Sequence, residues 1–103
     1  MIKIEATRKD GKIVNLTVKG HANSAPKGED LVCAAVSSVL VGGCNALNQP
    51  NCFAIKLSEA DASISELSIA NKHDYEVLET MMIQFKTIEE SNKKFLQVIE
   101  KGN

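Results

Sequence analysis

Hydrophobic and polar residues alternate in two segments near the amino end of the chain, residues 2–7 and 13–19. Alternation with a period of two is typical of strands that bury one face. The apolar positions that would face the core are Ile2, Ile4, Ala6, Val14, Leu16 and Val18. We therefore predict two strands joined by a hairpin at Asp10-Gly11.

The alternation also selects the length of the hairpin loop. A two-residue loop would set the apolar Ile4 opposite the polar Thr17. A three-residue loop over residues 9–11 pairs Ile4 with Leu16 instead, and apolar positions then face one another throughout. Gly11 would take the left-handed position that closes such a loop. We predict the three-residue loop.

The longest apolar stretch of the chain predicts a helix over residues 31–47, with Asp30 as its N-cap. This helix is apolar on nearly all sides, so we expect other layers to surround it. Gly42 and Gly43 lie in its interior, where each glycine costs about 1 kcal/mol relative to alanine. A close packing contact is therefore expected at this pair.

The second half of the chain predicts two further strands, over residues 53–58 and 62–69. In the later strand the apolar residues change from even to odd positions between Ile64 and Leu67, which we call a phase slip. A slip of this kind indicates a bulge or an edge position.

A second helix is predicted over residues 74–91, and β-branched residues within 95–99 favour a fifth strand over a continuation of that helix. The apolar stripe of the helix consists of Tyr75, Leu78, Met82, Phe85 and Ile88. The order ββαββα(β) is that of an α+β domain with a mainly antiparallel sheet and two helices.

Length and charge limit the function. The 103 residues suit one domain, which we assign to residues 1–103, and a net charge of −1 gives no attraction to nucleic acid or an anionic membrane. A transmembrane helix needs about 20 apolar residues, which no stretch offers, and the amino end lacks a secretory signal. We expect a soluble cytoplasmic protein without direct membrane or nucleic-acid partners.

The cysteines are expected to be free thiols. Cys33 and Cys44 share the predicted helix and would lie roughly 16 Å apart along its axis, whereas a disulfide needs Cα atoms within about 7 Å. Three cysteines, with Cys52 the third, cannot all pair, and free thiols are expected in a reducing compartment. His21 and His73 lack zinc-type spacing to the cysteines, so we expect neither a metal nor a cofactor.

Cys33 is the candidate nucleophile. With Asp30 as N-cap it lies in the first helical turn, where free N–H groups and the helix dipole favour a thiolate. His21 ends the second predicted strand beside Gly20, and a nearby histidine supplies the base that thiol catalysis requires. Position alone still favours a small buried cysteine and an ordinary histidine. His73 is the competing base, although helix capping explains it well.

Asp30 has two possible roles that conflict in part. As N-cap it accepts the backbone N–H of Cys33, and as a third catalytic group it would orient His21. An N–H bound to Asp30 cannot stabilise an oxyanion, and the carboxylate charge would raise the pKa of the thiol. We favour capping.

One long motif stands out in the chain: Gly20-His21-Ala22, a short loop, and Gly28-Glu29-Asp30-Leu31-Val32-Cys33-Ala34-Ala35-Val36-Ser37. This motif resembles the signature of the bacterial ribosomal-processing cysteine proteases (the Prp family). Asn45-Ala46-Leu47 and residues 86–90 also resemble the family, so the similarity covers essentially the whole chain. Many relatives carry a Tyr-Pro-x-Tyr-like run where this chain has residues 91–95, which touches no motif residue.

The resemblance implies that His21 is the catalytic base and Cys33 the nucleophile. It further implies removal of a short N-terminal extension, after a hydrophobic or aromatic tail, from a large-subunit ribosomal protein precursor of the L27 type. Family members form homodimers. We expect Gly20, Ala22 and Gly28 in the substrate loop, and residues 22–29 to close over a bound peptide.

Two other functions remain open at this level. A non-catalytic ribosome- or RNA-associated factor would carry the Cys/His pair incidentally, although RNA binders usually show a basic patch. A dimerisation module would instead pack Gly42 and Gly43 at an interface. Fast labelling of Cys33 by a thiol probe near neutral pH, slowed by His21→Ala, would favour the protease.

Overall fold

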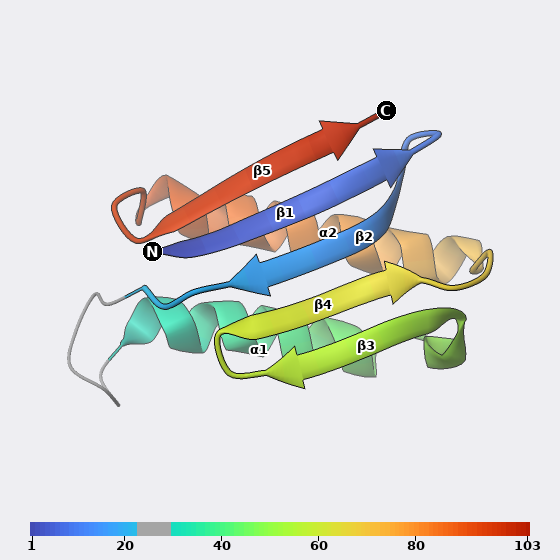
Figure 1. The fold of residues 1–103 in the computed structure, drawn as a ribbon, viewed down its shortest axis with the longest axis horizontal. Helices are drawn as coiled ribbons and strands as arrows, with labels where there is room; N and C mark the ends of the chain where they lie inside the picture. Colours follow the sequence, from blue (N-terminus) through green and yellow to red (C-terminus); the bar gives the residue numbers. More distant parts are fainter. Residues whose placement is uncertain (23–29) are drawn as a thin grey trace.

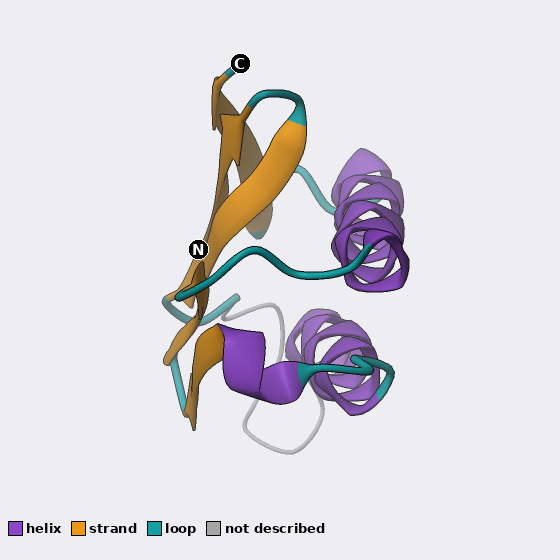
Figure 2. Ribbon diagram, turned by 90° about the vertical axis from the view of Figure 1, so that its right-hand side faces the viewer, coloured by secondary structure: helices purple, strands orange, loops and turns teal. Residues whose placement is uncertain are grey.

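The computed structural model describes residues 1–22 and 30–103. It consists of two layers, a five-stranded sheet and two helices that cover one of its faces (Figures 1 and 2). The elements are β1 (Ile2–Lys9), β2 (Lys12–Lys19), α1 (Leu31–Asn45), a 3-10 turn (Pro50–Cys52), β3 (Phe53–Ser58), β4 (Asp61–Glu66), α2 (Lys72–Glu90) and β5 (Leu96–Gly102). The predicted α+β class and the fifth strand are confirmed.

The strand order is β3-β4-β2-β1-β5. Every neighbouring pair is antiparallel except β1 and β5, which run parallel with Ile2 opposite Leu96 and Arg8 opposite Gly102. The first strand therefore lies inside the sheet, and the last strand forms an edge beside it.

The predicted three-residue hairpin loop is wrong. Lys9 pairs with Lys12, which leaves a two-residue turn at Asp10 and Gly11. Both turn residues have a positive φ, +52° and +78°, as a type I′ turn requires. This turn is common in hairpins because its backbone twist matches that of the flanking strands.

A β-bulge reconciles the short turn with the alternation. Thr7 pairs with Asn15 whereas Arg8 pairs with Ile13, so Val14 is the extra residue of β2. Beyond the bulge apolar positions do face one another, but Ile4 lies opposite Val18 rather than Leu16. Before the bulge the phase is inverted, and Ile13 is buried where Val14 was predicted. The alternation along the chain is compatible with a three-residue loop and also with a two-residue turn plus a bulge, because a bulge adds one residue to one strand only.

Helix α1 is not surrounded, which corrects the prediction. Its buried residues are Val32, Val36 and Leu40, which pack toward the sheet. Leu31 and Val41 on other sides are exposed, at 79% and 45%. Its regular part ends at Asn45, two residues before the predicted end at residue 47.

The predicted close contact exists at only one of the paired glycines. A Cβ placed on Gly43 would lie 2.2 Å from Sδ of Met81 on α2, whereas nothing lies within 4 Å of one placed on Gly42. Gly43 therefore serves helix packing within the chain.

The phase slip in the fourth strand has a simpler cause than a bulge or an edge. β4 ends at Glu66, and the N–H groups of Leu67 and Ser68 turn to the carbonyl of Cys52. The register of β4 with both neighbours is regular, and the strand lies between β3 and β2. Leu67 departs from the alternation because it lies outside the strand.

Helix α2 begins at Lys72, two residues before the predicted start, with Asn71 as N-cap. Four members of the predicted stripe are buried and Ile88 is partly buried. Asp74 is also fully buried, and its two carboxylate oxygens accept the N–H groups of Asn48 and Gln49 at 2.7 and 2.9 Å. This contact ties the segment after α1 to the start of α2.

Candidate functional site

His21 and Cys33 line the same pocket, which has a volume of about 220 Å³. Four parts of the fold meet there: the start of β1, the end of β2 with the segment after it, the first three turns of α1, and the turn between β3 and β4. These parts come together because β1, β2 and β4 are neighbours in the sheet and α1 packs across its face at the same end (Figure 1).

Cys33 is half-buried in the first turn of α1. The backbone N–H of Ala22 donates to its Sγ at 3.4 Å. Burial raises the pKa of the Cys33 thiol, the Ala22 N–H lowers it, and both the hydrogen bond and the charge of Asp30 raise it, with a net increase. A thiol with a raised pKa is protonated at neutral pH, so nucleophilic attack needs a base to remove the proton.

The backbone around Gly20 places His21 and Ala22 at this pocket. Gly20 has a φ of +94° and donates its N–H to the carbonyl of Ala60 at 2.9 Å. A Cβ at this position would lie 2.4 Å from the backbone oxygen of Met1. Only glycine fits here, and the exposed His21 follows it directly.

Asp30 is the N-cap of α1, and its Oδ1 accepts the backbone N–H of Cys33 at 3.0 Å. The contact places the carboxylate beside the sulfur while satisfying one of the free donors of the first turn. The Cys33 N–H is thereby committed to the cap and is not free to bind an oxyanion in this conformation.

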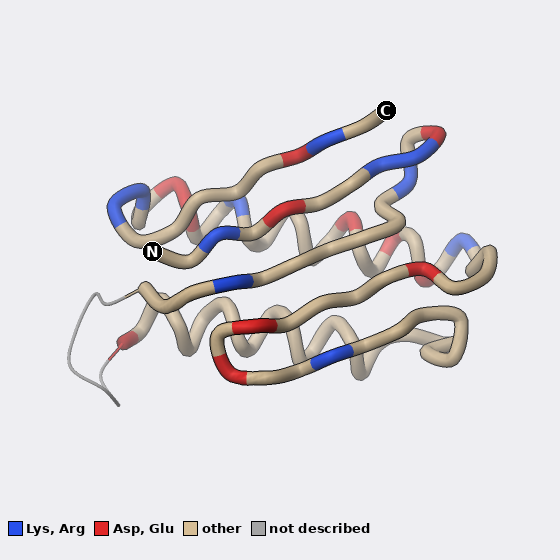
Figure 3. The backbone as a smooth tube through the Cα atoms, in the orientation of Figure 1, with Lys and Arg blue, Asp and Glu red and all other residues tan. Residues whose placement is uncertain are grey.

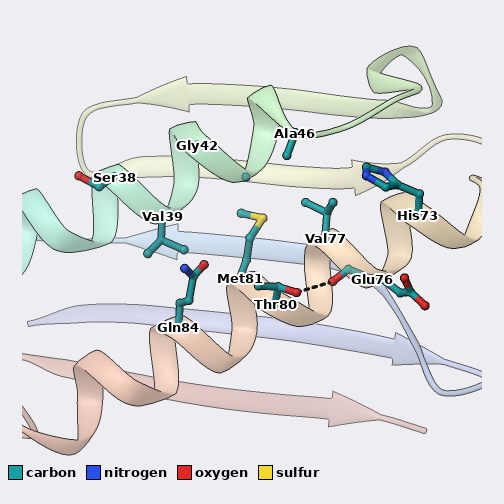
Figure 4. A pocket seen from close by; sticks show the side chains of 11 residues that line it. Ser38, Val39, Gly42, Ala46, His73, Glu76, Val77, Thr80, Met81 and Gln84 are labelled. Atoms are coloured by element: carbon teal, nitrogen blue, oxygen red, sulfur yellow. Dashed lines mark hydrogen bonds between the residues drawn. The ribbon is translucent and has the colours of Figure 1, made fainter.

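The structure does not bring His73 to Cys33. His73 lines a different pocket of about 450 Å³ between α1 and α2, where its side chain lies near Ala46 and Val77 (Figure 4). Its Nδ1 contacts Oδ1 of the buried Asp74 at 2.9 Å. Within the described residues, His21 is therefore the histidine that shares a pocket with a cysteine.

The other two cysteines lie outside the pocket of His21. Cys44 and Cys52 are half-buried and free, and both pack against the hydrophobic core. Burial raises the pKa of the Cys44 thiol. In the parts of the chain that the structure describes, no three His, Cys, Asp or Glu side chains form a group that could hold a metal ion.

Part of the predicted substrate loop cannot be compared. Gly20 lines the pocket and Ala22 contacts the sulfur, but Gly28 lies outside the described residues. The same holds for residues 23–29 of the segment predicted to close over a peptide.

The turn between β3 and β4 also lines the pocket and was missed by sequence reasoning, whereas the helix residue Ser37, another lining residue, appeared only as part of the resemblance motif. Ser37 follows Cys33 by four residues, so helical spacing offered a signal for it. The turn offered none, because its place beside β2 depends on the strand order.

Two comparisons of sequence agree on one family. The family model described as cysteine protease Prp matches residues 1–97. The ribosomal processing cysteine protease Prp of Staphylococcus aureus is 32% identical over 98 residues, which cover 87% of this chain and 90% of that protein. The protein of the same name from Mycoplasma pneumoniae is 34% identical over 85 residues, covering 79% and 81%.

Solved structures show the same similarity. The essential ribosomal processing protease Prp from S. aureus, in complex with a covalently linked product peptide, superposes with a TM-score of 0.88 at 29% identity, covering 98% of this chain and 100% of that chain. Its complex with a substrate peptide gives a TM-score of 0.82 at 28% identity, with the same coverage. Among the helices of the described residues, none has the length and hydropathy needed to cross a membrane.

Proposed function

Because the chain belongs to the cysteine protease Prp family, we propose that it removes the N-terminal extension of a large-subunit ribosomal protein precursor, with Cys33 as nucleophile and His21 as general base. The observation that carries this proposal is the shared pocket of His21 and Cys33, in which the Ala22 N–H contacts the sulfur. Asp30 acts as the helix cap and as a support for this arrangement.

The chemistry follows from the protonated state of Cys33. His21 takes the thiol proton as Sγ forms a bond to the carbonyl carbon of the scissile peptide. The C–N bond then breaks, His21 donates its proton to the leaving amine, and a thioester to Cys33 remains. Water attacks the thioester with His21 as base, which releases the new carboxyl group and returns the thiol.

The pocket supports a peptide substrate with an apolar residue near the scissile bond. Its walls include the apolar side chains of Val18, Val36 and Leu40 beside the polar pair. An extension that ends in hydrophobic or aromatic residues fits such walls. We propose a precursor of the L27 type as the substrate, and action in the cytoplasm as a homodimer.

The test is incubation with a peptide that spans the extension and the first mature residues of the host's own ribosomal protein. Wild-type protein should give two products at a single bond, and Cys33→Ala should give none. An acyl adduct on Cys33, seen by mass spectrometry after a rapid acid quench, would identify the nucleophile. An intact peptide in the presence of folded wild-type protein would overturn the proposal.

Two matched variants make the result specific. Cys52→Ala removes a half-buried thiol outside the pocket and should cleave at the wild-type rate. Cys33→Ala should retain thermal stability, because loss of one half-buried sulfur costs less than the roughly 2 to 5 kcal/mol of a large core truncation. An unchanged rate in Cys33→Ala would rule this residue out.

A further inference from the structure

The turn between β3 and β4 forms one wall of the pocket that holds Cys33. Ser58, Glu59, Ala60 and Asp61 all line it. Ser58 pairs with Asp61, so Glu59 and Ala60 form a two-residue hairpin turn.

Contacts on both sides fix the turn in place. The Ala60 carbonyl accepts the N–H of Gly20, the residue directly before His21. On the other side Lys56 Nζ binds Asp61 Oδ2 at 2.7 Å. Ala60 itself has a φ of +61°, which is uncommon for a residue with a side chain. A turn held in this way presents its side chains at a constant place relative to the catalytic pair.

The turn carries two acidic side chains, and they differ in whether a basic side chain lies against them. Asp61 is paired with Lys56, and Lys19 lies close enough to act on its charge. Glu59 is exposed and makes no ion pair or hydrogen bond with the rest of the described residues. Figure 3 shows the acidic segments of this turn at the end of the sheet where α1 begins. Among residues 1–22 and 30–103, the wall beside Cys33 thus carries one carboxylate that no basic side chain contacts.

We propose that Glu59 is a specificity-determining residue that binds a lysine or arginine side chain of the substrate, close to the scissile bond; this inference rests on the proposed protease function. The basic side chain belongs to a substrate position other than the one whose apolar side chain lies against Val18, Val36 and Leu40. Its charged end reaches Glu59 at the turn that forms another wall of the same pocket. A partly exposed ion pair of this kind changes kcat/KM by about two- to fivefold.

The experiment uses the peptide that spans the processing site, with Lys, Gln and Glu placed in turn at each of three positions on either side of the scissile bond. Wild-type protein should prefer Lys over Gln by about two- to fivefold in kcat/KM at one position or more. Glu59→Gln should abolish that preference, and Glu59→Lys should replace it with a preference for Glu. The preference should shrink at high salt, because exposed charges are screened.

Glu76→Gln is the matched control. It makes the same change of charge on an exposed glutamate of the other pocket, and it should leave the preference for Lys intact. Equal Lys to Gln ratios in wild type and Glu59→Gln, or no preference at any position in wild type, would overturn the inference while the protease function stands.

Binding separates this inference from the proposed function. Affinities of the same peptides for Cys33→Ala, and for Cys33→Ala combined with Glu59→Gln, require no turnover. A preference for Lys that disappears in the double variant supports Glu59 even where no peptide is cleaved. The same affinity for Lys and Gln peptides in both variants sinks the role of Glu59 whatever the cleavage assay shows.

Discussion

At Cys33 opposing influences act on one sulfur atom. Burial and the neighbouring Asp30 raise the pKa of the thiol, while the Ala22 N–H lowers it, and the raising influences prevail. This balance favours the thiol over a stored thiolate. The rate of attack should depend on His21 and should rise with pH as the thiol ionises.

Asp30→Asn should lower the pKa of Cys33, because both the charge and the hydrogen bond of Asp30 raise it. Asparagine caps a helix about as well as aspartate, so stability should change little, whereas Asp30→Ala should lose about 1 kcal/mol. The pH dependence of alkylation by iodoacetamide, with thermal unfolding alongside, measures both effects.

The outcomes for Asp30 discriminate between its two roles. If the pH midpoint of the alkylation rate is the same in Asp30→Asn as in wild type, the carboxylate does not control the pKa of the thiol. If Asp30→Asn loses turnover as completely as Cys33→Ala, the charge itself is required. The preference for capping over an orienting role toward His21 would then be wrong.

At the scale of elements, the contact between α1 and α2 depends on the absence of one side chain. Gly43→Ala gains about 1 kcal/mol of helix propensity but forces the buried Met81 to move, which costs about 1 to 3 kcal/mol. We expect a net loss of about 1 kcal/mol. Urea unfolding at equilibrium measures the free-energy change.

Gly42→Ala is the control for this prediction, since it adds the same methyl group one residue away in open space. It should stabilise the fold by about 0.5 to 1 kcal/mol. Shortening Met81 to Ala in the Gly43→Ala background should cost less than the sum of the two single changes. Equal effects at Gly42 and Gly43 would contradict the packing argument.

The elements also show where local reasoning from the sequence works and where it stops. Periodicity located every strand and both helices to within a few residues, because period and burial are linked along one element. It failed at Val14, where a bulge changes the phase, and at Leu67, where the strand has already ended. Both depend on pairing with another strand, which a single segment does not encode.

The site divides in the same way. His21, Asp30 and Cys33 are close in sequence and flank one loop, so strand and helix boundaries made them candidates, and the family resemblance assigned His21 and Cys33 as a pair. The turn with Glu59 reaches the pocket only because β4 pairs with β2. Predicting that neighbour requires the order of the whole sheet.

At the scale of the molecule, Asp74 couples its stability to pH. Burial raises the pKa of Asp74. Contacts with His73 and with the N–H groups of Asn48 and Gln49 lower this pKa by a larger amount, so the net change is a decrease. The folded pKa lies below the unfolded value of about 3.9. The ionised group therefore stabilises the fold above that pH, and this contribution is lost as the pH falls through the folded pKa.

Asp74→Asn should destabilise the protein by about 2 to 3 kcal/mol at pH 7, because an amide offers one acceptor where two N–H groups need one each. The difference in the free energy of unfolding between variant and wild type should narrow as the pH falls below about 4, because the unfolded chain then binds a proton at Asp74 that the folded wild type does not. Urea titrations at both pH values measure it. A gap that is constant with pH would show that the charge of Asp74 contributes nothing.

The parallel pairing of β1 with β5 also has a consequence for synthesis of the protein on the ribosome. Ile2 pairs with Leu96, and its N–H donates to the carbonyl of Phe95, so β1 cannot complete its pairing until β5 has been synthesised. Closing so long a loop is entropically slow, and an emerging chain keeps the edge of β1 unpaired. Ile2 is also a wall of the pocket of Cys33. A growing chain therefore lacks the partner strand that lies beside Ile2 until residues 96–102 have been made, so this wall of the pocket is among the last parts of the fold to be fixed.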